Sequence, residues 1–286
     1  MTEHQHFVLK ATCPATSGVI AAVTTFLAER GCYISELAQF DDQQQGYFFM
    51  RTVCEIRHSS HTIASIRDSF PVVAERFGME FSFHDLSQPM KVLIMVSKFD
   101  HCLDNLLYRY RKGELPIEIT AVVANHLDLR PMAEREGIRF IYLPVNKETK
   151  SQQERELLRV VTETGTELVV LARYMQILSD SLCKELHGRA INIHHSFLPG
   201  FKGARPYHQA YERGVKLIGA TAHYVTADLD EGPIIEQAVQ QVDHTFSADA
   251  LTAIGRDTET TALAKAVLLH VEHRVFLDGN KTVVFR

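Results

Sequence analysis

Hydrophobic and polar positions follow two different patterns along the chain, and the first of them covers about 86 residues. Strands are expected at 6–12, 33–40, 47–56 and 79–86, and helices at 16–30 and 60–77. Gly31 should end the first helix, and Pro71 should break or kink the second because proline lacks a backbone N–H. The order β-α-β-β-α-β predicts a ferredoxin-like domain over residues 1–86. A short polar segment, 87–90, would link it to the rest of the chain.

From residue 91 onward, short apolar strands alternate with helices. The strands are expected at 91–97, 117–125, 140–145, 167–172 and 189–195, and the helices at 101–112, 128–136, 151–164 and 179–187. This alternation is typical of a parallel sheet with helices on both faces. After it we expect a Gly/Pro-rich loop (198–206), a short helix (207–213), extended segments (217–226 and 233–242), a long helix (247–273) and a terminal hairpin. We therefore predict an α/β chain whose second domain, 91–286, is Rossmann-like and mostly parallel.

Composition narrows the class of protein. The 286 residues are 45% hydrophobic and 23% charged, the balance of a globular protein, and the net charge of −5 argues against non-specific nucleic-acid binding. No apolar run approaches the roughly 18 residues of a membrane helix, and the N-terminus lacks the pattern of a secretory signal. The five cysteines are scattered without a C-x-x-C pair, which argues against disulfides and a cysteine zinc site and predicts the reducing cytoplasm.

The densest group of chemically capable side chains lies at the end of the expected strand 189–195. Ligands of open α/β sheets bind outside the carboxyl ends of the strands. Because strand side chains alternate, Asn192 and His194 should share one face and His195 should point to the other. The asparagine amide can donate to an oxyanion growing on a carbonyl group. The histidine can move a proton near neutral pH.

An acidic loop, 227–233, supplies a third candidate group. A carboxylate that reached His194 from this loop would hold the histidine tautomer, stabilise the imidazolium or polarise a water molecule. With no nucleophilic serine or cysteine in the set, water or an amine would be the attacking group. The alternative is that Asp228, Asp230 and Glu231 are turn residues, the usual role of Asp beside glycine.

The other polar residues nearby have structural interpretations of their own. His195, His208 and His223 are packed or surface histidines on the simplest hypothesis, which we favour for His223. Ser196 lacks the G-x-S-x-G context of a nucleophile. Adjacent strand histidines that point to opposite faces also argue against a zinc site.

The stretch INIHHSFLPGFKGARPYHQAYERGVKLIGATAHYVTADLDEGPIIEQ (191–237) resembles the folate-dependent formyltransferase/hydrolase family. That family has an Asn, a His two residues later and an Asp in an LD-x-G loop, so the resemblance implies that Asn192, His194 and Asp230 are catalytic. The segment LARYMQILS (171–179) looks like the family's pterin-pocket loop. The substrate-binding residues implied by these motifs are Leu171, Arg173, Tyr174, Met175, Ile177, Ile193, Asp228 and Gly232.

Within that family the chain is similar to the formyltetrahydrofolate deformylases, through HHSFLP and the start C-P-x-x-x-G-V-I-A-x-V. The resemblance implies an ACT domain before a formyltransferase-like domain. It also implies hydrolysis of the amide C–N bond of 10-formyltetrahydrofolate to tetrahydrofolate and formate, which balances one-carbon pools and supplies formate for purine synthesis.

The same resemblance extends to partners and to cofactors. It implies a homo-oligomer, an amino-acid effector at the ACT domain and no cofactor or metal, with folate as the substrate. Two positions depart from the pattern. Ala15 stands where members often have Asp, which leaves the effector open, and Gln176 stands where relatives often have Arg, so we assign it no folate contact.

Three activities stay open at this point: hydrolysis, formyl transfer to a small amine, and amino-acid sensing without catalysis. Glycinamide ribonucleotide transformylases bind a phosphate with a glycine-rich loop after the first strand, whereas the turn here, Ser97–His101, has no glycine and carries Phe99 and Asp100. Another segment would have to bind the phosphate.

Methionyl-tRNA formyltransferases carry a C-terminal barrel, and the 49 residues after Gln237 are too few for one. The residues also leave two roles for His194: donation to the oxyanion or protonation of N10.

Overall fold

Contacts along the chain divide it into two units, each described here by itself. The computed structural model describes residues 5–57, 60–196 and 206–286. The first unit comprises residues 1–89 with Glu272–Phe276 and Val283–Arg286, and the second comprises Met90–Val271 with Leu277–Thr282. The sequence placed all of 91–286 in the second domain. The difference arises because the two C-terminal segments contact the first unit: Lys10 Nζ, for example, donates to Val275 O at 2.6 Å.

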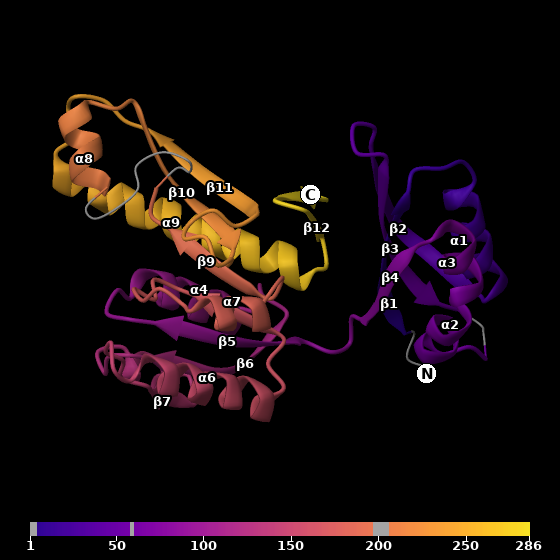
Figure 1. The fold of residues 1–286 in the computed structure, drawn as a ribbon, viewed down its shortest axis with the longest axis horizontal. Coiled ribbons are helices and arrows are strands. Elements are labelled where there is room, and N and C mark those ends of the chain that lie inside the picture. Colours follow the sequence, from indigo (N-terminus) through magenta and orange to yellow (C-terminus); the bar gives the residue numbers. More distant parts are fainter. Residues whose placement is uncertain (1–4, 58–59, 197–205) are drawn as a thin grey trace. The chain divides into compact units, whose positions relative to one another are not determined.

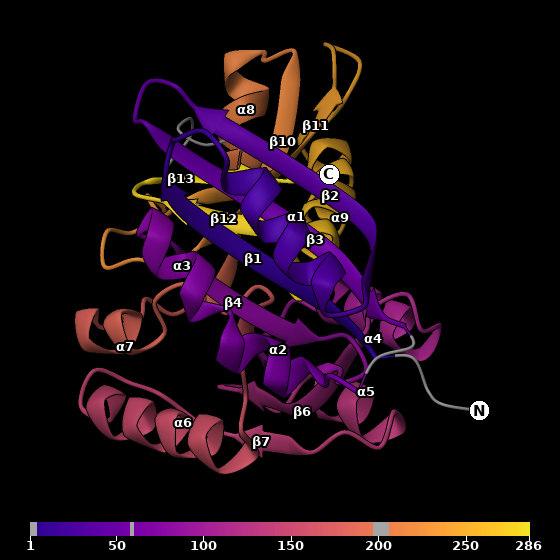
Figure 2. The ribbon, with the colours of Figure 1, turned by 90° about the vertical axis from the view of Figure 1, so that its right-hand side faces the viewer.

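The first unit is an antiparallel sheet with helices on one face (Figure 2). Its strands are β1 (His6–Pro14), β2 (Cys32–Asp42), β3 (Tyr47–Ile56) and β4 (Glu80–Asp85), in the spatial order β2-β3-β1-β4. Its helices are α1 (Val19–Glu29), α2 (Ile63–Ser69) and α3 (Pro71–Phe77). Pro71 begins α3, so the predicted break separates two short helices. This is the predicted ferredoxin-like order, consistent with an ACT-like domain.

The core of the first unit lies between the sheet and these helices. Apolar residues from both layers are fully buried there, among them Phe7, Leu9, Val23, Ile66 and Phe70. Phe70 packs edge-on against Phe26, with ring centroids 5.2 Å apart. The prediction of an amphipathic helix at α1 is therefore confirmed, because its apolar face covers the sheet.

The second unit is built on a seven-stranded, mostly parallel sheet. Its strands are β5 (Met90–Val96), β6 (Ile117–Ala124), β7 (Phe140–Tyr142), β8 (Leu168–Leu171), β9 (Ala190–His194), β10 (Leu217–Tyr224) and β11 (Ile234–Gln241). The spatial order is β11-β10-β9-β8-β5-β6-β7, with β10 antiparallel to both β9 and β11. The chain therefore starts in the middle of the sheet and builds outward on both sides of β5, which leaves a crevice at the carboxyl ends of these central strands.

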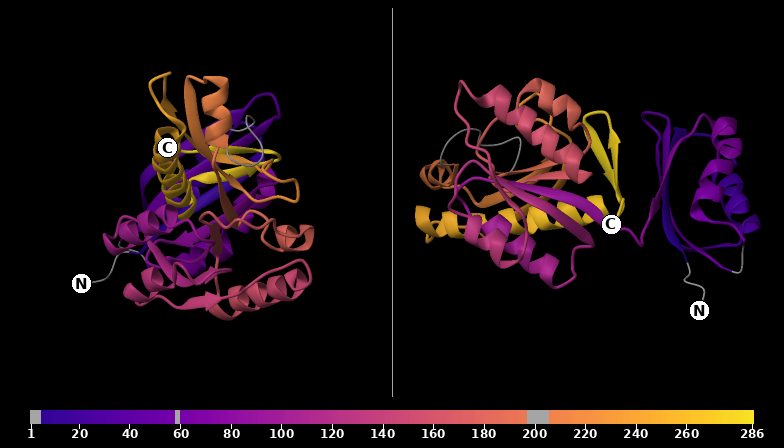
Figure 3. Two further views of the ribbon diagram at one scale, coloured as in Figure 1. Left: turned by 90° about the vertical axis from the view of Figure 1, so that its left-hand side faces the viewer. Right: turned by 90° about the horizontal axis from the view of Figure 1, so that it is seen from below.

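Helices cover both faces of this sheet (Figures 1 and 3). They are α4 (His101–Arg111), α5 (Arg130–Arg135), α6 (Lys150–Thr164), α7 (Asp180–Glu185), α8 (Pro206–Arg213) and α9 (Ala248–Val271). Leu157 of α6 and Leu182 of α7 pack with Leu93 and Met95 of β5 in one buried cluster. The long α9 runs beside β10 and β11 and packs against α4. The chain ends in the predicted hairpin, β12 (Val275–Asp278) and β13 (Lys281–Val284).

Two further observations concern predictions made from composition. In the part of the chain that the structure covers, no helix combines the length and apolar character needed to span a membrane. All five cysteines are buried and free. The predicted Gly/Pro-rich loop, 198–206, lies outside the described residues apart from Pro206, the first residue of α8.

Candidate active site

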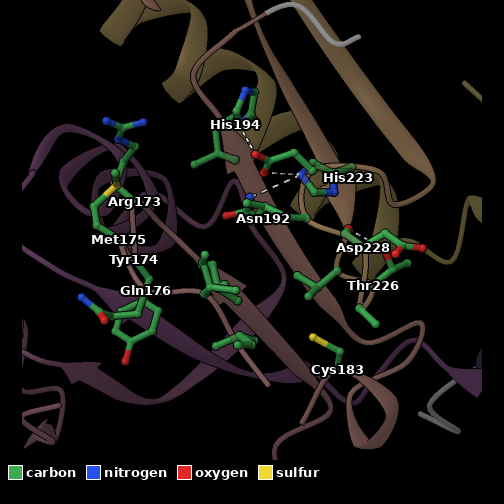
Figure 4. A pocket seen from close by; sticks show the side chains of 18 of the residues that line it. Arg173, Tyr174, Met175, Gln176, Cys183, Asn192, His194, His223, Thr226 and Asp228 are labelled. Carbon is green, nitrogen blue, oxygen red and sulfur yellow. Dashed lines mark hydrogen bonds and ion pairs between the residues drawn. The ribbon is translucent and has the colours of Figure 1, made fainter. Parts of the chain in front are cut away.

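Three segments meet at the carboxyl ends of the central strands: the loop after β8, the end of β9, and the loop that joins β10 to β11 (Figure 4). Asn192 and His194 lie two residues apart on β9, so their side chains share one face. Asp230 comes from the β10–β11 loop, and its Oδ2 lies 3.2 Å from Nδ1 of His194. The three residues that the sequence singled out, far apart along the chain, therefore converge.

The contact between Asp230 and His194 fixes the proton on the imidazole. An ionised carboxylate only accepts hydrogen bonds, so Nδ1 of His194 donates to Oδ2. Burial alone would raise the pKa of Asp230, but interactions with the neighbouring histidines, led by the hydrogen bond from His194, together outweigh burial and lower it. Nε2 of His194 is buried and has no hydrogen-bond partner among the described residues. This nitrogen is thus a buried polar atom that a bound substrate or water molecule can satisfy.

A second histidine orients the amide of Asn192. Nδ1 of His223 donates to Tyr224 O at 2.9 Å, so Nε2 of the neutral ring is an acceptor, and it lies 3.3 Å from Nδ2 of Asn192. Burial lowers the pKa of His223, although the bond to Tyr224 O and the charge of Asp230 oppose that shift. Because one N–H of Asn192 points to His223, the amide nitrogen is held at the site and its other N–H can serve a substrate.

The β10–β11 loop needs an unusual backbone to bring Asp230 inward. Asp230 has φ 58, in the left-handed region that Asp and Asn enter more readily than most residues. A turn precedes it, in which Thr226 Oγ1 and Glu231 N both donate to Asp228 O, at 3.0 and 3.3 Å. At Gly232 a Cβ atom would lie 1.7 Å from Tyr224 O, so only glycine lets the loop lie against β10.

A cavity of about 240 Å³ opens beside the three residues. All but one of the predicted substrate-binding residues line it: Leu171, Arg173, Tyr174, Met175, Ile177, Ile193 and Asp228. Gly232 is the exception, because it packs against the Tyr224 backbone and shapes the loop from behind. Gln176, to which the sequence assigned no contact, is also in the wall.

The loop after β8, which forms part of the cavity wall, is anchored by side-chain hydrogen bonds and not by a helix or strand. Ser97 Oγ accepts from Met175 N at 3.0 Å and donates to Asn125 Oδ1 at 2.8 Å, so the turn after β5 supports this loop. Tyr174 OH accepts from Gln153 Nε2 at 3.0 Å, which ties the loop to α6. These anchors keep the backbone of the loop at the cavity surface.

One prediction about the histidines is wrong, and one is incomplete. His195 was expected to point away from His194, but their rings stack with centroids 4.9 Å apart, and both line the cavity. The reason is that β9 ends at His194, so the alternation of strand side chains stops there. His223 is packed, as expected, with 2% of its surface exposed, but it also lines the cavity and pairs with Asn192 across the β9–β10 ladder, which the sequence did not predict. That register belongs to the fold, so no pattern within either strand would have identified this pair. His208 is exposed on α8 and is not part of the wall.

One group in the described part of the chain has the residue types of a metal site. It consists of His101, Cys102 and Glu259, whose ligand atoms lie within 4.8 Å of one another. The guanidinium of Arg173, with Nε 3.3 Å from Oε2 of Glu259, would repel a cation there. This group is separate from the Asn192–His194–Asp230 set.

Comparison with known proteins gives a family. Residues 90–267 match the formyl transferase family. A formyltetrahydrofolate deformylase from Corynebacterium sp. (strain P-1) is 52% identical over 286 residues, the whole of both chains. The chain belongs to the formyltetrahydrofolate deformylase family. The relative from Bacillus subtilis (strain 168) is 45% identical over 97% of this chain and 93% of its own. The crystal structure of the formyltetrahydrofolate deformylase from Burkholderia mallei is 52% identical, with TM-score 0.94, and the match covers 99% of this chain and 100% of that one.

The transformylases are more distant from this deformylase-family chain. Glycinamide ribonucleotide transformylase 1 from Symbiobacterium toebii is 26% identical, with TM-score 0.66. The match covers 97% of that protein but 71% of this chain. The full-length similarity to the deformylases, which includes the first unit, therefore separates the two groups.

Proposed function

We propose that this chain hydrolyses 10-formyltetrahydrofolate to tetrahydrofolate and formate. The observation that carries the proposal is the His194–Asp230 pair beside Asn192, with a buried Nε2 of His194 that lacks a partner among the described residues at a cavity. An amide donor, an imidazole and a carboxylate at one point suit addition of water to an acyl carbon. Membership of the deformylase family over the full chain supports the same reaction.

In the proposed mechanism, a water molecule adds to the formyl carbon and the C–N10 bond then breaks. Asp230 positions or polarises the water and keeps His194 in the tautomer that leaves Nε2 facing the substrate. Asn192 donates its second N–H to the oxyanion of the tetrahedral intermediate. Nε2 of His194 takes the proton that the attacking water releases, and the resulting imidazolium donates to that oxyanion or passes the proton to N10 as it leaves. One water molecule thus supplies the hydroxyl group of formic acid and the proton on N10 of tetrahydrofolate, and formic acid then ionises to formate.

The pterin ring would lie between the two loops that form the cavity wall, 171–178 and 226–232, and use their backbone groups. A second cavity of about 520 Å³ adjoins the first and shares Tyr174–Leu178 with it. Lys147 and Lys150 line this second cavity, and their charges suit the glutamate carboxylates of the substrate tail. We therefore propose that the tail leaves the pterin pocket along this side.

Formyl transfer to an amine is the alternative that the turn after β5 disfavours. The turn carries Phe99, which is 43% exposed, and Asp100, the residue before α4. A phosphorylated acceptor would meet a carboxylate and a bulky ring there instead of a cradle of backbone N–H groups. Water is the nucleophile that needs no such site.

The test is to incubate the purified full-length chain with 10-formyltetrahydrofolate and no acceptor, and to follow the absorbance of tetrahydrofolate together with formate. We expect equal amounts of both products and no change after exhaustive chelation. Formate that appeared only after an amine was added would establish the transferase instead. Loss of turnover on chelation that is restored by added metal would contradict a metal-free site.

For the first unit we propose the association and amino-acid sensing that its ACT-like order suggests. β2 is an edge strand, and its exposed apolar residues include Tyr33, Leu37 and Phe40. A second copy that paired at this edge would cover them. Light scattering of the full chain against Leu37→Arg tests this: an unchanged mass in the variant would contradict pairing at β2. The cytoplasm remains the proposed location, because the scattered cysteines suit a reducing compartment.

A further inference from the structure

A buried carboxylate on α9 organises a cluster outside the Asn192–His194–Asp230 set. Glu259 is 1% exposed. Its Oε2 accepts from His101 Nε2 at 2.7 Å, and its Oε1 accepts from Tyr207 OH at 2.8 Å. Burial alone would raise the pKa of Glu259, but the hydrogen bond from His101 and the charge of Arg173 outweigh it and lower that pKa. The carboxylate is therefore ionised, and it needs a cation inside the protein.

Arg173 is that cation, and it connects Glu259 to the cavity wall. Its Nε lies 3.3 Å from Oε2 of Glu259. Its Nη1 lies 2.6 Å from Nδ1 of His195, and the guanidinium stands over the ring of Phe99, 4.9 Å from the centroid. The backbone of Arg173 has φ 65, an unfavourable conformation for a residue with a side chain. Contacts to the buried guanidinium hold the residue in that conformation.

The contact between Arg173 and His195 determines the protonation of the second ring. Arginine nitrogens only donate, so Nδ1 of His195 must accept and carries no proton. A neutral His195 then has its hydrogen on Nε2. Its ring stacks on that of His194 at an interplanar angle of 24°. His194 therefore has a neutral aromatic neighbour rather than a second imidazolium.

We propose that Glu259 is a positioning residue for the hydrolysis. It holds Arg173 in place, and Arg173 in turn keeps His195 as a neutral ring against His194. When His194 takes a proton during turnover, a charged neighbour would oppose it and a neutral neighbour does not. Glu259 also balances the charge of Arg173 close to the site. The inference rests on the proposed function, because turnover is one of its readouts.

The principal test is Glu259→Gln in the full-length chain, which keeps the shape of the side chain and removes its charge. We expect kcat to fall about 10- to 100-fold, the usual effect of losing a group that orients a functional side chain, with KM changed by less than about 3-fold. Arg173→Met and the double variant complete a cycle. If Glu259 acts through Arg173, the double variant should be no slower than Arg173→Met alone.

Two controls separate this role from general loosening of the cluster. Tyr207→Phe removes the hydrogen bond to Oε1 but leaves Arg173 in place, so kcat should stay near the wild-type value. Lys265→Met breaks another ion pair of α9, with Glu236 at 3.0 Å, and should also leave kcat unchanged. Glu259→Asp keeps the charge and should recover part of the activity lost in Glu259→Gln.

A direct readout comes from the nitrogen chemical shifts of labelled histidine, with the His195 signals assigned by their loss in His195→Gln. The wild type should show a neutral ring with the proton on Nε2, and Glu259→Gln should lose that signature. Wild-type kcat in Glu259→Gln, additive effects in the double variant, or unchanged His195 shifts would each overturn the proposal.

If Glu259→Gln does not fold, Arg173→Lys decides, since it keeps the positive charge but lacks the planar fork that reaches both partners. A fall in kcat at constant KM in Arg173→Lys supports the proposal, and wild-type kcat refutes it. A wild-type chain that released no formate would instead refute the proposed function, and the histidine shifts would still report on the contact.

Discussion

Replacing Asp230 by asparagine removes a single charge from the site and changes little else. The two side chains have the same shape, and asparagine also tolerates the left-handed backbone at φ 58. The carboxylate lies 3.2 Å from Nδ1 of His194. At an effective dielectric constant of about 20, unit charges at that separation attract by about 5 kcal/mol. Because each 1.36 kcal/mol is roughly a factor of ten, we expect kcat to fall about 10³- to 10⁴-fold.

The assay measures formate and tetrahydrofolate from saturating 10-formyltetrahydrofolate, with circular dichroism to confirm that the variant folds. Glu231→Gln is the matched control: it removes a carboxylate from an exposed position of the same loop, outside the cavity lining, and should cost less than about tenfold. If folded Asp230→Asn kept more than a tenth of the wild-type kcat, the charge on Asp230 would not be stabilising His194 during the reaction.

Three further predictions follow from other residues. Asn192→Ala removes the proposed oxyanion donor and should lower kcat roughly 10²- to 10³-fold in the formate assay, whereas a change below tenfold would exclude that role. Gly232→Ala places Cβ 1.7 Å from Tyr224 O, so it should cost about 1–3 kcal/mol or more of unfolding free energy, seen as a lower Tm, and an unchanged Tm would contradict the packing. Burial, with a smaller contribution from the charge of Lys10, lowers the pKa of His84 from 6.5 to about 4. The unfolded chain therefore binds this proton more readily than the folded protein, so the folded protein loses stability as the pH falls from 6.5 toward 4, and none of this stability is lost above pH 6.5. Between pH 7 and pH 5 the unfolding free energy should therefore drop by about 2 kcal/mol more in the wild type than in His84→Gln, measured by urea titration, and equal losses would show that His84 is not the responsible group.

The sequence alone determined the types of the elements and most of the strand and helix positions. The reason is that periodicity is a local property: a half-buried helix or a buried strand shows it within one segment. Pro71 shows the same locality, because its missing N–H breaks the helix whatever packs around it. The C-terminal segment Glu272–Phe276 was placed with the wrong unit, because its place depends on contacts with residues such as Lys10, more than 260 positions earlier.

The candidate site was predictable where its residues belong to one strand or one motif. Asn192 and His194 share a face because strand side chains alternate, and the LD-x-G motif pointed to Asp230. His223 was missed because its place opposite Asn192 depends on the register between β9 and β10, which neither strand contains by itself. His195 was misplaced because β9 ends one residue earlier, and a strand end depends on its neighbours.

Tertiary structure alone decided the protonation and orientation of the polar groups. The tautomer of His194 depends on Asp230, that of His223 on a backbone carbonyl, and that of His195 on a guanidinium held from α9. A hydrogen bond takes its direction from two partners at about 3 Å, and here the partners come from segments far apart along the chain. The sequence supplied the groups that can accept or donate, and the fold selected which of them do so by bringing particular pairs into contact.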